Sequence, residues 1–306
     1  PVVFRRNEFM VISPSTKDDL VARGVDERRI TVVLCGLDHG RYRHLGFERF
    51  PDPVIVHLGR LRKYKSVEVA LRAMTRIRER LPSAKLIVVG DGPHRPALER
   101  EARRLGLGAA VEFRGHVGDE DLVALLNRSH LLVNPSPKEG WGLTVVEGAA
   151  CGVPVVASDR PGLRDSVWNG ETGLLVPYGD AEALAASSLR ILEDRALWER
   201  LSRGALDRVK ELTWDRCARE TLALLERVVA TPAGQIYALF LVHRNAARTD
   251  ELHYGVRPHE LDEVVDLFRF AGELECNGFQ RYVNYFRPEY LGQLVDLRTL
   301  GRLRGH

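Results

Sequence analysis

Two acidic residues, Glu139 and Glu147, flank the start of an expected helix and are well placed for chemistry. They lie in residues 134–158, which run from an apolar strand through a loop rich in Pro and Gly into a short helix of small residues and then into a second strand. If the helix begins near Leu143, Glu139 lies just before its N-terminus and Glu147 a little over one turn inside it. The loop follows the carboxyl end of a strand, which is where open parallel sheets bind ligands.

The helix start between the two acids is suited to an anion. The backbone N–H groups of Gly142, Leu143 and Thr144 have no partner within such a helix, and the positive end of its macrodipole favours negative charge. A phosphate in the middle, with hydroxyl groups bound by the acid on each side, describes a nucleotide sugar. Glu147 could instead face solvent, but its neighbours are apolar, and a buried carboxylate needs hydrogen-bond donors that ligand hydroxyls would supply.

Two cations follow the first strand of the repeat, at the same edge of the expected sheet. Arg60 and Lys65 could hold the two phosphate groups of a diphosphate and stabilise the charge that develops when a nucleoside diphosphate leaves. The alternative is that both are solvated loop cations, which are common in a chain with 45 Lys and Arg residues.

Three other motifs are weaker candidates for a functional site. Residues 90–92, Gly-Asp-Gly, are a fragment of a dinucleotide fingerprint, and Pro93 after them is typical of the first residue of a helix. Residues 119–121, Asp-Glu-Asp, have the spacing used by metal-dependent sugar transferases, but acidic residues are also expected at a helix start. We therefore expect no metal site. His116 is the one histidine expected near the ligand edge.

Composition indicates a globular protein with no cofactor signature. The net charge of +3 is small beside 45 basic and 42 acidic residues, so nucleic-acid binding is not expected. The four cysteines are far apart, and no apolar run approaches the ~20 residues needed to span a bilayer. We expect a cytoplasmic protein, with peripheral attachment to a membrane as the alternative.

Apolar strands alternate with amphipathic helices over residues 53–230, which predicts an α/β fold with a doubly wound parallel sheet. Residues 1–50 contain one more β-α-β unit, with a polar turn at residues 13–16 before its helix. Residues 231–306 lose the alternation, and a helix from His259 to about Leu274 makes them a largely helical C-terminal extension of unknown role. The expected domains are therefore 1–50, 51–230 and 231–306.

Several motifs in order resemble the donor domain of glycosyltransferase family 4. They are Gly59-Arg60-Leu61 with Lys65, Gly90-Asp91-Gly92-Pro93, Phe113-Arg114-Gly115, the run from Glu139-Gly140-Trp141-Gly142-Leu143 to Glu147, and residues 150–157. The resemblance covers about residues 8–230. It implies the GT-B fold of two facing Rossmann-like domains, and transfer from a nucleotide sugar with retention of anomeric configuration and without a metal.

The resemblance also assigns roles. Arg60, Lys65 and Glu139 are the implied catalytic residues, with the two cations on the diphosphate and Glu139 on hydroxyl groups of the donor sugar. Glu147 would bind the ribose, and residues 114–119 would lie near the base. The implied donor-binding residues are Gly59, Arg60, Lys65, Arg114, Val117, Asp119, Glu139, Gly140, Trp141, Gly142, Leu143, Thr144 and Glu147.

The sequence departs from the family pattern in three ways. Trp141 stands where phenylalanine is more usual, and Ser66 stands where glycine commonly follows the lysine. Residues 1–50 match only the last β-α-β unit of the N-terminal acceptor domain that such enzymes carry, so we expect this chain to supply mainly the donor half, with a partner chain as one source of the rest. The acceptor, whether glycan, lipid or small molecule, is not indicated. The alternatives are a non-catalytic nucleotide-sugar-binding module, one subunit of a split enzyme, and a nucleotide-sugar epimerase.

Overall fold

The computed structural model describes residues 8–229, 239–243 and 252–256. The chain divides into two compact units, one of residues 1–36, 212–244 and 250–306, and the other of residues 37–211 and 245–249. Their boundaries at 36/37 and 211/212 differ from the boundaries at 50/51 and 230/231 that the sequence suggests. We describe each unit separately.

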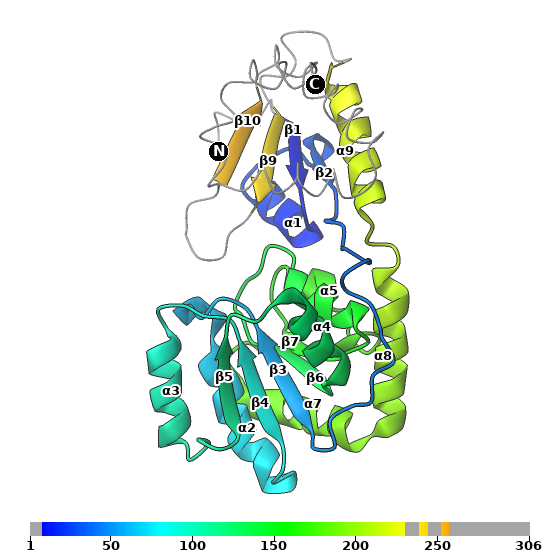
Figure 1. Cartoon of the computed structure of the whole chain (residues 1–306). Helices are drawn as coiled ribbons and strands as arrows, with labels where there is room; N and C mark the ends of the chain where they lie inside the picture. The colour runs from blue at the N-terminus through cyan, green and yellow to red at the C-terminus, as the bar shows by residue number, and fades with distance from the viewer. Residues whose placement is uncertain (1–7, 230–238, 244–251, 257–306) are drawn as a thin grey trace, which may run out of the picture. The chain divides into compact units, whose positions relative to one another are not determined.

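The second unit is built on a six-stranded sheet (Figure 1). Its strands are β3 (Val54–Leu58), β4 (Lys85–Val89), β5 (Val111–Gly115), β6 (Leu131–Asn134), β7 (Val155–Ser158) and β8 (Gly173–Val176). The order is β5-β4-β3-β6-β7-β8 and every neighbouring pair is parallel, which confirms the predicted doubly wound sheet. The order reverses between β3 and β6, so the connections leaving these two strands run in opposite directions and open a crevice at their carboxyl ends.

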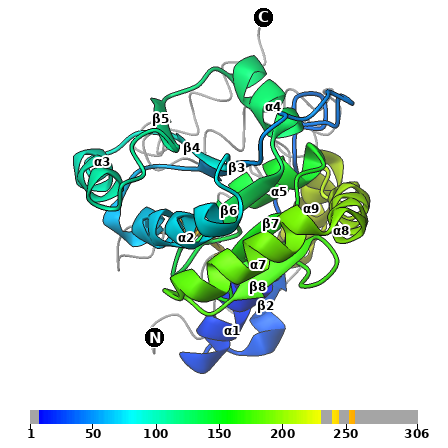
Figure 2. The same ribbon diagram turned by 90° about the horizontal axis from the view of Figure 1, so that it is seen from below.

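Helices cover both faces of this sheet (Figure 2). They are α2 (Val67–Arg80), α3 (Arg95–Arg104), α4 (Asp119–Arg128), α5 (Leu143–Ala150), α6 (Leu163–Ser166), α7 (Ala181–Glu193) and α8 (Arg195–Val209). On one face, Ile55 and Leu131 of the strands share a buried core with Leu71 of α2 and Leu184 of α7. On the other face, Leu132 lies against α5. Because successive strand residues are buried on opposite faces, the strands are apolar at consecutive positions.

Residues 37–50 belong to the second unit and are held in it by polar contacts. The Asn127 side chain donates to the Arg43 carbonyl at 3.0 Å and accepts from the Leu45 N–H at 2.6 Å. The Arg49 guanidinium stacks 4.0 Å from the Trp198 ring centroid, and burial lowers its pKa to about 10. The segment that the sequence groups with the first β-α-β unit is therefore anchored beside the six-stranded sheet.

The first unit contains a four-stranded sheet of order β10-β9-β1-β2. Its described elements are β1 (Glu8–Val11), α1 (Pro14–Ala22), β2 (Ile30–Val32), α9 (Trp214–Val229), β9 (Leu239–His243) and β10 (Leu252–Val256). Strand β1 pairs in parallel with β2 and β9, and β10 is antiparallel to β9. The described parts of residues 231–306 are thus strands. The helix expected from His259 to about Leu274 lies outside the described residues.

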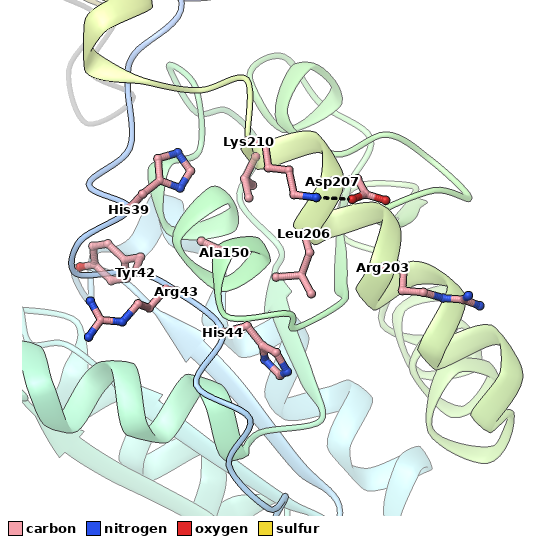
Figure 3. Close-up of a pocket in the computed structure, with 10 residues that line it drawn as sticks. His39, Tyr42, Arg43, His44, Ala150, Arg203, Leu206, Asp207 and Lys210 are labelled. Carbon is pink, nitrogen blue, oxygen red and sulfur yellow. Dashed lines mark hydrogen bonds and ion pairs between the residues drawn. The ribbon is translucent and has the colours of Figure 1, made fainter.

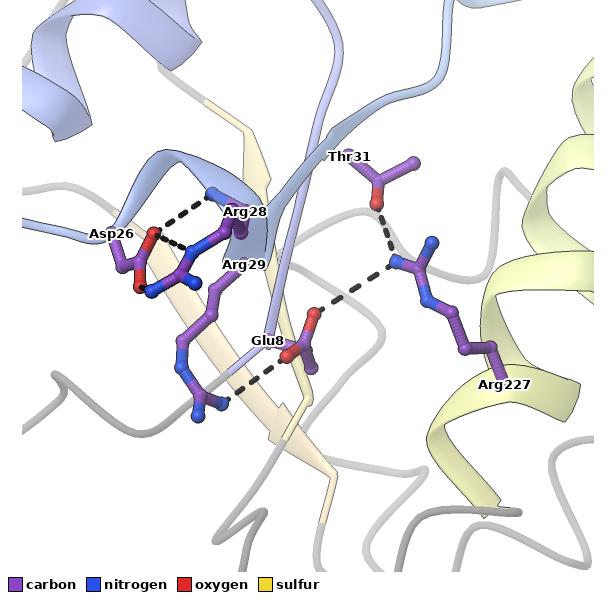
Figure 4. Close-up of polar contacts among 6 residues, drawn as sticks. All are labelled: Glu8, Asp26, Arg28, Arg29, Thr31 and Arg227. Carbon is purple, nitrogen blue, oxygen red and sulfur yellow. Dashed lines mark hydrogen bonds and ion pairs between the residues drawn. The ribbon is translucent and has the colours of Figure 1, made fainter.

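Polar contacts join α9 to the strands of the first unit (Figure 4). Arg227 of α9 donates to the Thr31 hydroxyl at 2.8 Å and lies 3.8 Å from Glu8, which also pairs with Arg29 at 3.2 Å. Two local expectations about helix starts were wrong. Ser13 is the N-cap of α1, so residues 14–16 are its first turn, and α3 begins at Arg95 rather than at Pro93.

Candidate functional site

Lys65 and Glu139 meet where the sheet order reverses. Lys65 lies in a 3₁₀ turn after β3 (η3, Lys63–Lys65), and Glu139 lies in the loop after β6. The Lys65 Nζ donates to Glu139 Oε1 at 2.5 Å, and each side chain is only 12% exposed. The backbone N–H of Glu139 donates to the carbonyl oxygen of Pro161 at 3.1 Å, so the loop after β7, which contains Pro161, supports Glu139. The two residues predicted to bind phosphate and sugar are therefore direct neighbours.

The N-terminus of α5 is open beside this pair. Its N-cap is Gly142, with φ of 81°, and a glycine has no side chain to cap the helix. A glycine suits this position because other residues are strained at positive φ. Leu143, the first helical residue, is 43% exposed, whereas Trp141 is 3% exposed. Exposure at this helix start therefore begins at Leu143 and continues partly at Thr144, while the N-cap Gly142 is buried.

Glu147 is held in a polar cluster made by residues 41–42. The Tyr42 hydroxyl donates to the Glu147 carboxylate, and the positive charge of Arg41 also acts on it. Burial raises the pKa of Glu147 to about 7, and the hydrogen bond from Tyr42 and the charge of Arg41 offset part of that effect. Tyr42 is 9% exposed, and burial together with the charge of Glu147 raises its own pKa. Sequence reasoning missed both residues because it placed residues 1–50 in a separate domain.

Asp119, the first acid of the Asp-x-Asp motif, forms an ion pair with Arg41. The distance between Arg41 Nη1 and Asp119 Oδ2 is 2.8 Å. Among the described residues, no group of three or more His, Cys, Asp or Glu side chains is arranged to hold a metal ion. Residues 119–121 open helix α4, and Asp119 also forms this ion pair.

The remaining predicted residues lie along the same edge with different exposure. Arg60 is exposed at the end of β3, and Gly59 before it has φ of 152°. Arg114 is exposed and forms an ion pair with Glu112 at 2.8 Å, so its guanidinium is engaged within β5. Three others are partly buried: Val117, Gly140 and Thr144.

The Gly-Asp-Gly segment after β4 has a packing role. A Cβ on Gly90 would lie 2.1 Å from the Gly59 carbonyl oxygen, and one on Gly92 would lie 2.4 Å from the carbonyl oxygen of Leu61. The loops after β3 and β4 therefore touch backbone to backbone. These glycines support the loop that carries Lys65.

His57 lies closer to the site than the sequence suggested. It is fully buried at the end of β3, its Nδ1 lies 3.2 Å from the Val133 carbonyl oxygen, and its Nε2 has no hydrogen-bond partner among the described residues. Burial, reinforced by the charge of Lys65, lowers the pKa of His57 to about 4, so the ring is neutral at physiological pH. His116, the histidine expected at this edge, is exposed.

A cavity of about 440 Å³ lies at the other end of α5, between residues 39–44 and α8 (Figure 3). Tyr42, Ala150 and Leu206 are among its lining residues, and Lys65, Glu139 and Glu147 are not. The guanidinium groups of Arg43 and Arg203 point away from each other (Figure 3). The cavity therefore adjoins the Glu147 end of the site through Tyr42, but it does not include the Lys65–Glu139 pair.

The fold and the site define a class of protein. A doubly wound parallel sheet with a buried lysine–glutamate pair and an open helix start at its switch point is a Rossmann-like unit suited to a phosphate-bearing ligand. Comparison with family models identifies the family: residues 47–208 match the model described as glycosyl transferases group 1, and the chain belongs to this family. The unit has the fold of GT-B glycosyltransferases, as predicted.

Known proteins resemble most of the chain. A glycogen synthase of Mycobacterium tuberculosis (strain CDC 1551 / Oshkosh) is 32% identical over 239 residues, which are 77% of this chain and 55% of that protein. A D-inositol 3-phosphate glycosyltransferase of Salinispora tropica is 31% identical over 253 residues, covering 75% and 52% of the two chains. The chain thus spans about half the length of the curated relatives it matches.

Solved structures share the fold. Sucrose-phosphate synthase from Thermosynechococcus elongatus superposes with a TM-score of 0.66 at 30% identity, over 72% of this chain and 58% of that one. Anabaena HepE, solved in complex with UDP-glucose, gives a TM-score of 0.63 at 21% identity, over 72% and 64% of the two chains. Across the part of the chain that the structure describes, every helix is too short or too polar to cross a membrane.

Proposed function

We propose that this chain binds a nucleoside-diphosphate sugar at the carboxyl ends of β3 and β6. It supplies the donor-binding half of a retaining, metal-independent glycosyltransferase of family 4, which transfers the sugar to an acceptor hydroxyl. The observation that carries the proposal is the ion pair between Lys65 and Glu139, 2.5 Å long and largely buried, beside the open N-terminus of α5.

The ligand groups follow from the chemistry of the neighbouring side chains. The diphosphate lies at the start of α5, where free N–H groups, Lys65 and Arg60 offset its charge. Glu139 accepts hydrogen bonds from hydroxyl groups of the sugar. Glu147, a little over one turn into α5, accepts from the ribose, and residues 114–119 at the end of β5 lie near the base.

The Lys65–Glu139 pair prepares the site for such a ligand. Each charge compensates the other while no ligand is bound, so neither is left unpaired in a place where it is 12% exposed. A bound nucleotide sugar offers a phosphate oxygen to Lys65 and a hydroxyl donor to Glu139. Both side chains then gain a new partner at the point where the sugar is joined to the diphosphate.

The transfer breaks the bond between the anomeric carbon and the phosphate oxygen, forms a bond from that carbon to the acceptor oxygen, and moves one proton. The acceptor oxygen bonds to the anomeric carbon on the face from which the phosphate oxygen departs, and the acceptor proton passes to that phosphate oxygen. The products are a glycoside with retained configuration and a nucleoside diphosphate. Arg60, Lys65 and the helix start stabilise the negative charge that develops on the leaving group.

The known relatives support this chemistry. The curated relatives are named as glycogen synthase and D-inositol 3-phosphate glycosyltransferase, and HepE was solved with UDP-glucose bound. We therefore choose UDP-glucose as the first probe for this chain.

Titration calorimetry of the full chain with UDP-glucose and other nucleotide sugars tests the proposal. Loss of one charge-assisted hydrogen bond costs about 1.5–3 kcal/mol, so Lys65→Ala should weaken binding by roughly one to two powers of ten. Lys63→Ala is the matched control, because Lys63 is exposed in the same 3₁₀ turn and should bind like the wild type.

Two further arms test the remaining parts of the proposal. Glu147→Ala should weaken binding, whereas Asp121→Ala and added chelator should leave it unchanged. If chelator abolishes binding, the transferase needs a metal. If no nucleotide sugar binds at millimolar concentration, the proposed function is wrong for this chain.

A further inference from the structure

Ser66 has an unusual backbone conformation next to Lys65. Its φ of 52° and ψ of 36° are left-handed, and it is the one non-glycine residue with positive φ among the residues described. L-residues avoid this region because the Cβ approaches the backbone too closely. Ser66 ends the 3₁₀ turn and also stands at the N-cap of α2, so its conformation sets the direction in which the chain leaves Lys65.

The Ser66 side chain is held from two sides. Its Oγ donates to the Tyr64 carbonyl at 3.4 Å and lies 3.1 Å from the Tyr178 hydroxyl. Either hydroxyl can donate in the contact between Ser66 and Tyr178. The residue is 4% exposed, so solvent offers little replacement for these bonds.

Tyr178 reaches this loop from the far edge of the sheet. It follows β8 and is 40% exposed, with the Arg160 guanidinium 5.2 Å from its ring centroid. Phenylalanine would keep the ring contact with Arg160, so the hydroxyl contact with Ser66 is what distinguishes a tyrosine at this position.

We infer that Tyr178 is a positioning residue for donor binding: by fixing Ser66 in its left-handed conformation, it holds Lys65 against Glu139 at the diphosphate site. The inference rests on the proposed function, because it assigns Lys65 to the diphosphate. A glycine at position 66 adopts the left-handed conformation without strain and has no hydroxyl for Tyr178 to bind. A serine at position 66 therefore needs the hydrogen bond with Tyr178 to hold a backbone conformation that a glycine adopts freely.

A double-mutant cycle separates positioning from direct contact with the ligand. Tyr178→Phe should weaken UDP-glucose binding about three- to tenfold, the range for loss of one neutral hydrogen bond. Ser66→Gly should bind at least as tightly as the wild type, and adding Tyr178→Phe to Ser66→Gly should cost nothing further. Equal losses in both backgrounds, or no loss in either, would overturn the inference.

A second readout needs no donor. We expect acetic anhydride to label Lys65 faster in Tyr178→Phe than in the wild type, and not in the Ser66→Gly background. Mass spectrometry measures this labelling, with the exposed Lys63 as the internal control. If the wild type fails to bind UDP-glucose but Lys65 shows this pattern, the positioning role stands and the donor assignment fails. Unchanged Lys65 labelling overturns the positioning role whatever the donor.

Discussion

Binding of a nucleotide sugar should strengthen as pH rises through 7, and Glu147→Gln should abolish this dependence. Burial raises the pKa of Glu147 to about 7, so the carboxyl group changes charge in the physiological range. Only the ionised carboxylate can accept hydrogen bonds from ribose hydroxyls on both oxygens. The diphosphate of a nucleotide sugar has no secondary phosphate ionisation, so the charge of the ligand stays constant across this range.

The magnitude follows from the ionised fraction of Glu147. With a pKa of about 7, about one carboxyl in eleven is ionised at pH 6 and about ten in eleven at pH 8. The dissociation constant of UDP-glucose should therefore be about tenfold higher at pH 6, which corresponds to about 1.4 kcal/mol. Because the ligand favours the ionised form, binding at pH 7 should release about half a proton.

Calorimetry in two buffers of different ionisation enthalpy measures both quantities. In Glu147→Gln the affinity should be weaker at pH 8 and nearly equal at pH 6 and pH 8, with little proton release. A wild-type affinity that is the same at pH 6 and pH 8, or proton uptake on binding, would refute the reasoning.

The same group makes an independent prediction for stability without ligand. The pKa of Glu147 rises from 4.5 to about 7 on folding, so the folded protein resists ionisation. Its stabilising contribution is complete below pH 4.5 and falls as pH rises to 7, by about 3 kcal/mol in total. Glu147→Gln has no such loss, so its free energy of unfolding relative to wild type should increase between pH 5 and pH 8. Urea unfolding at the two pH values checks the sign.

Two further substitutions test the surroundings of the site. Tyr42→Phe removes a hydrogen bond that lowers the pKa of Glu147, so the midpoint of the pH dependence of binding should move above 7, and a midpoint at or below 7 would contradict the contact. Gly162→Ala should lower both stability and donor affinity, because its Cβ would lie 2.1 Å from the Glu139 carbonyl oxygen, whereas Gly170→Ala has nearly the same φ with nothing within 4 Å. Thermal unfolding and calorimetry compare the two variants, and equal effects would show that the collision with Glu139 is unimportant.

The second unit could be predicted from the sequence in considerable detail. The strands Val54–Leu58 and Lys85–Val89 and the helix Asp119–Arg128 all lie within residues 53–230, whose alternation predicts this sheet. Each is a buried apolar run or an amphipathic helix with clear end signals, and such local patterns determine element type strongly. The four-residue helix Leu163–Ser166 was missed because one turn gives no periodicity to read.

The meeting of Lys65 with Glu139 could also be predicted, because each follows a parallel strand and such strands end at one edge of the sheet. The partners that set the properties of the site could not be predicted. Ser66 and Tyr178 are 112 residues apart, and a tyrosine in a loop carries no local sign of what its hydroxyl binds. Tyr42 lies in residues 1–50, which the sequence suggests form a separate domain.

The two glutamates show why this difference matters for function. The sequence pattern of two acids around a helix start does not distinguish Glu139 from Glu147. In the structure, Glu139 forms an ion pair with Lys65, whereas Glu147 is buried beside the Tyr42 hydroxyl, and the nearby Arg41 is itself paired with Asp119. The carboxylate beside a cation competes with the donor phosphate for that cation, so its contribution to binding should be sensitive to the charge of the ligand. The carboxylate beside the hydroxyl gains or loses its own charge near neutral pH, so its contribution should be sensitive to protons. Glu139 should therefore make donor binding depend on the charge of the ligand, and Glu147 should make it depend on pH.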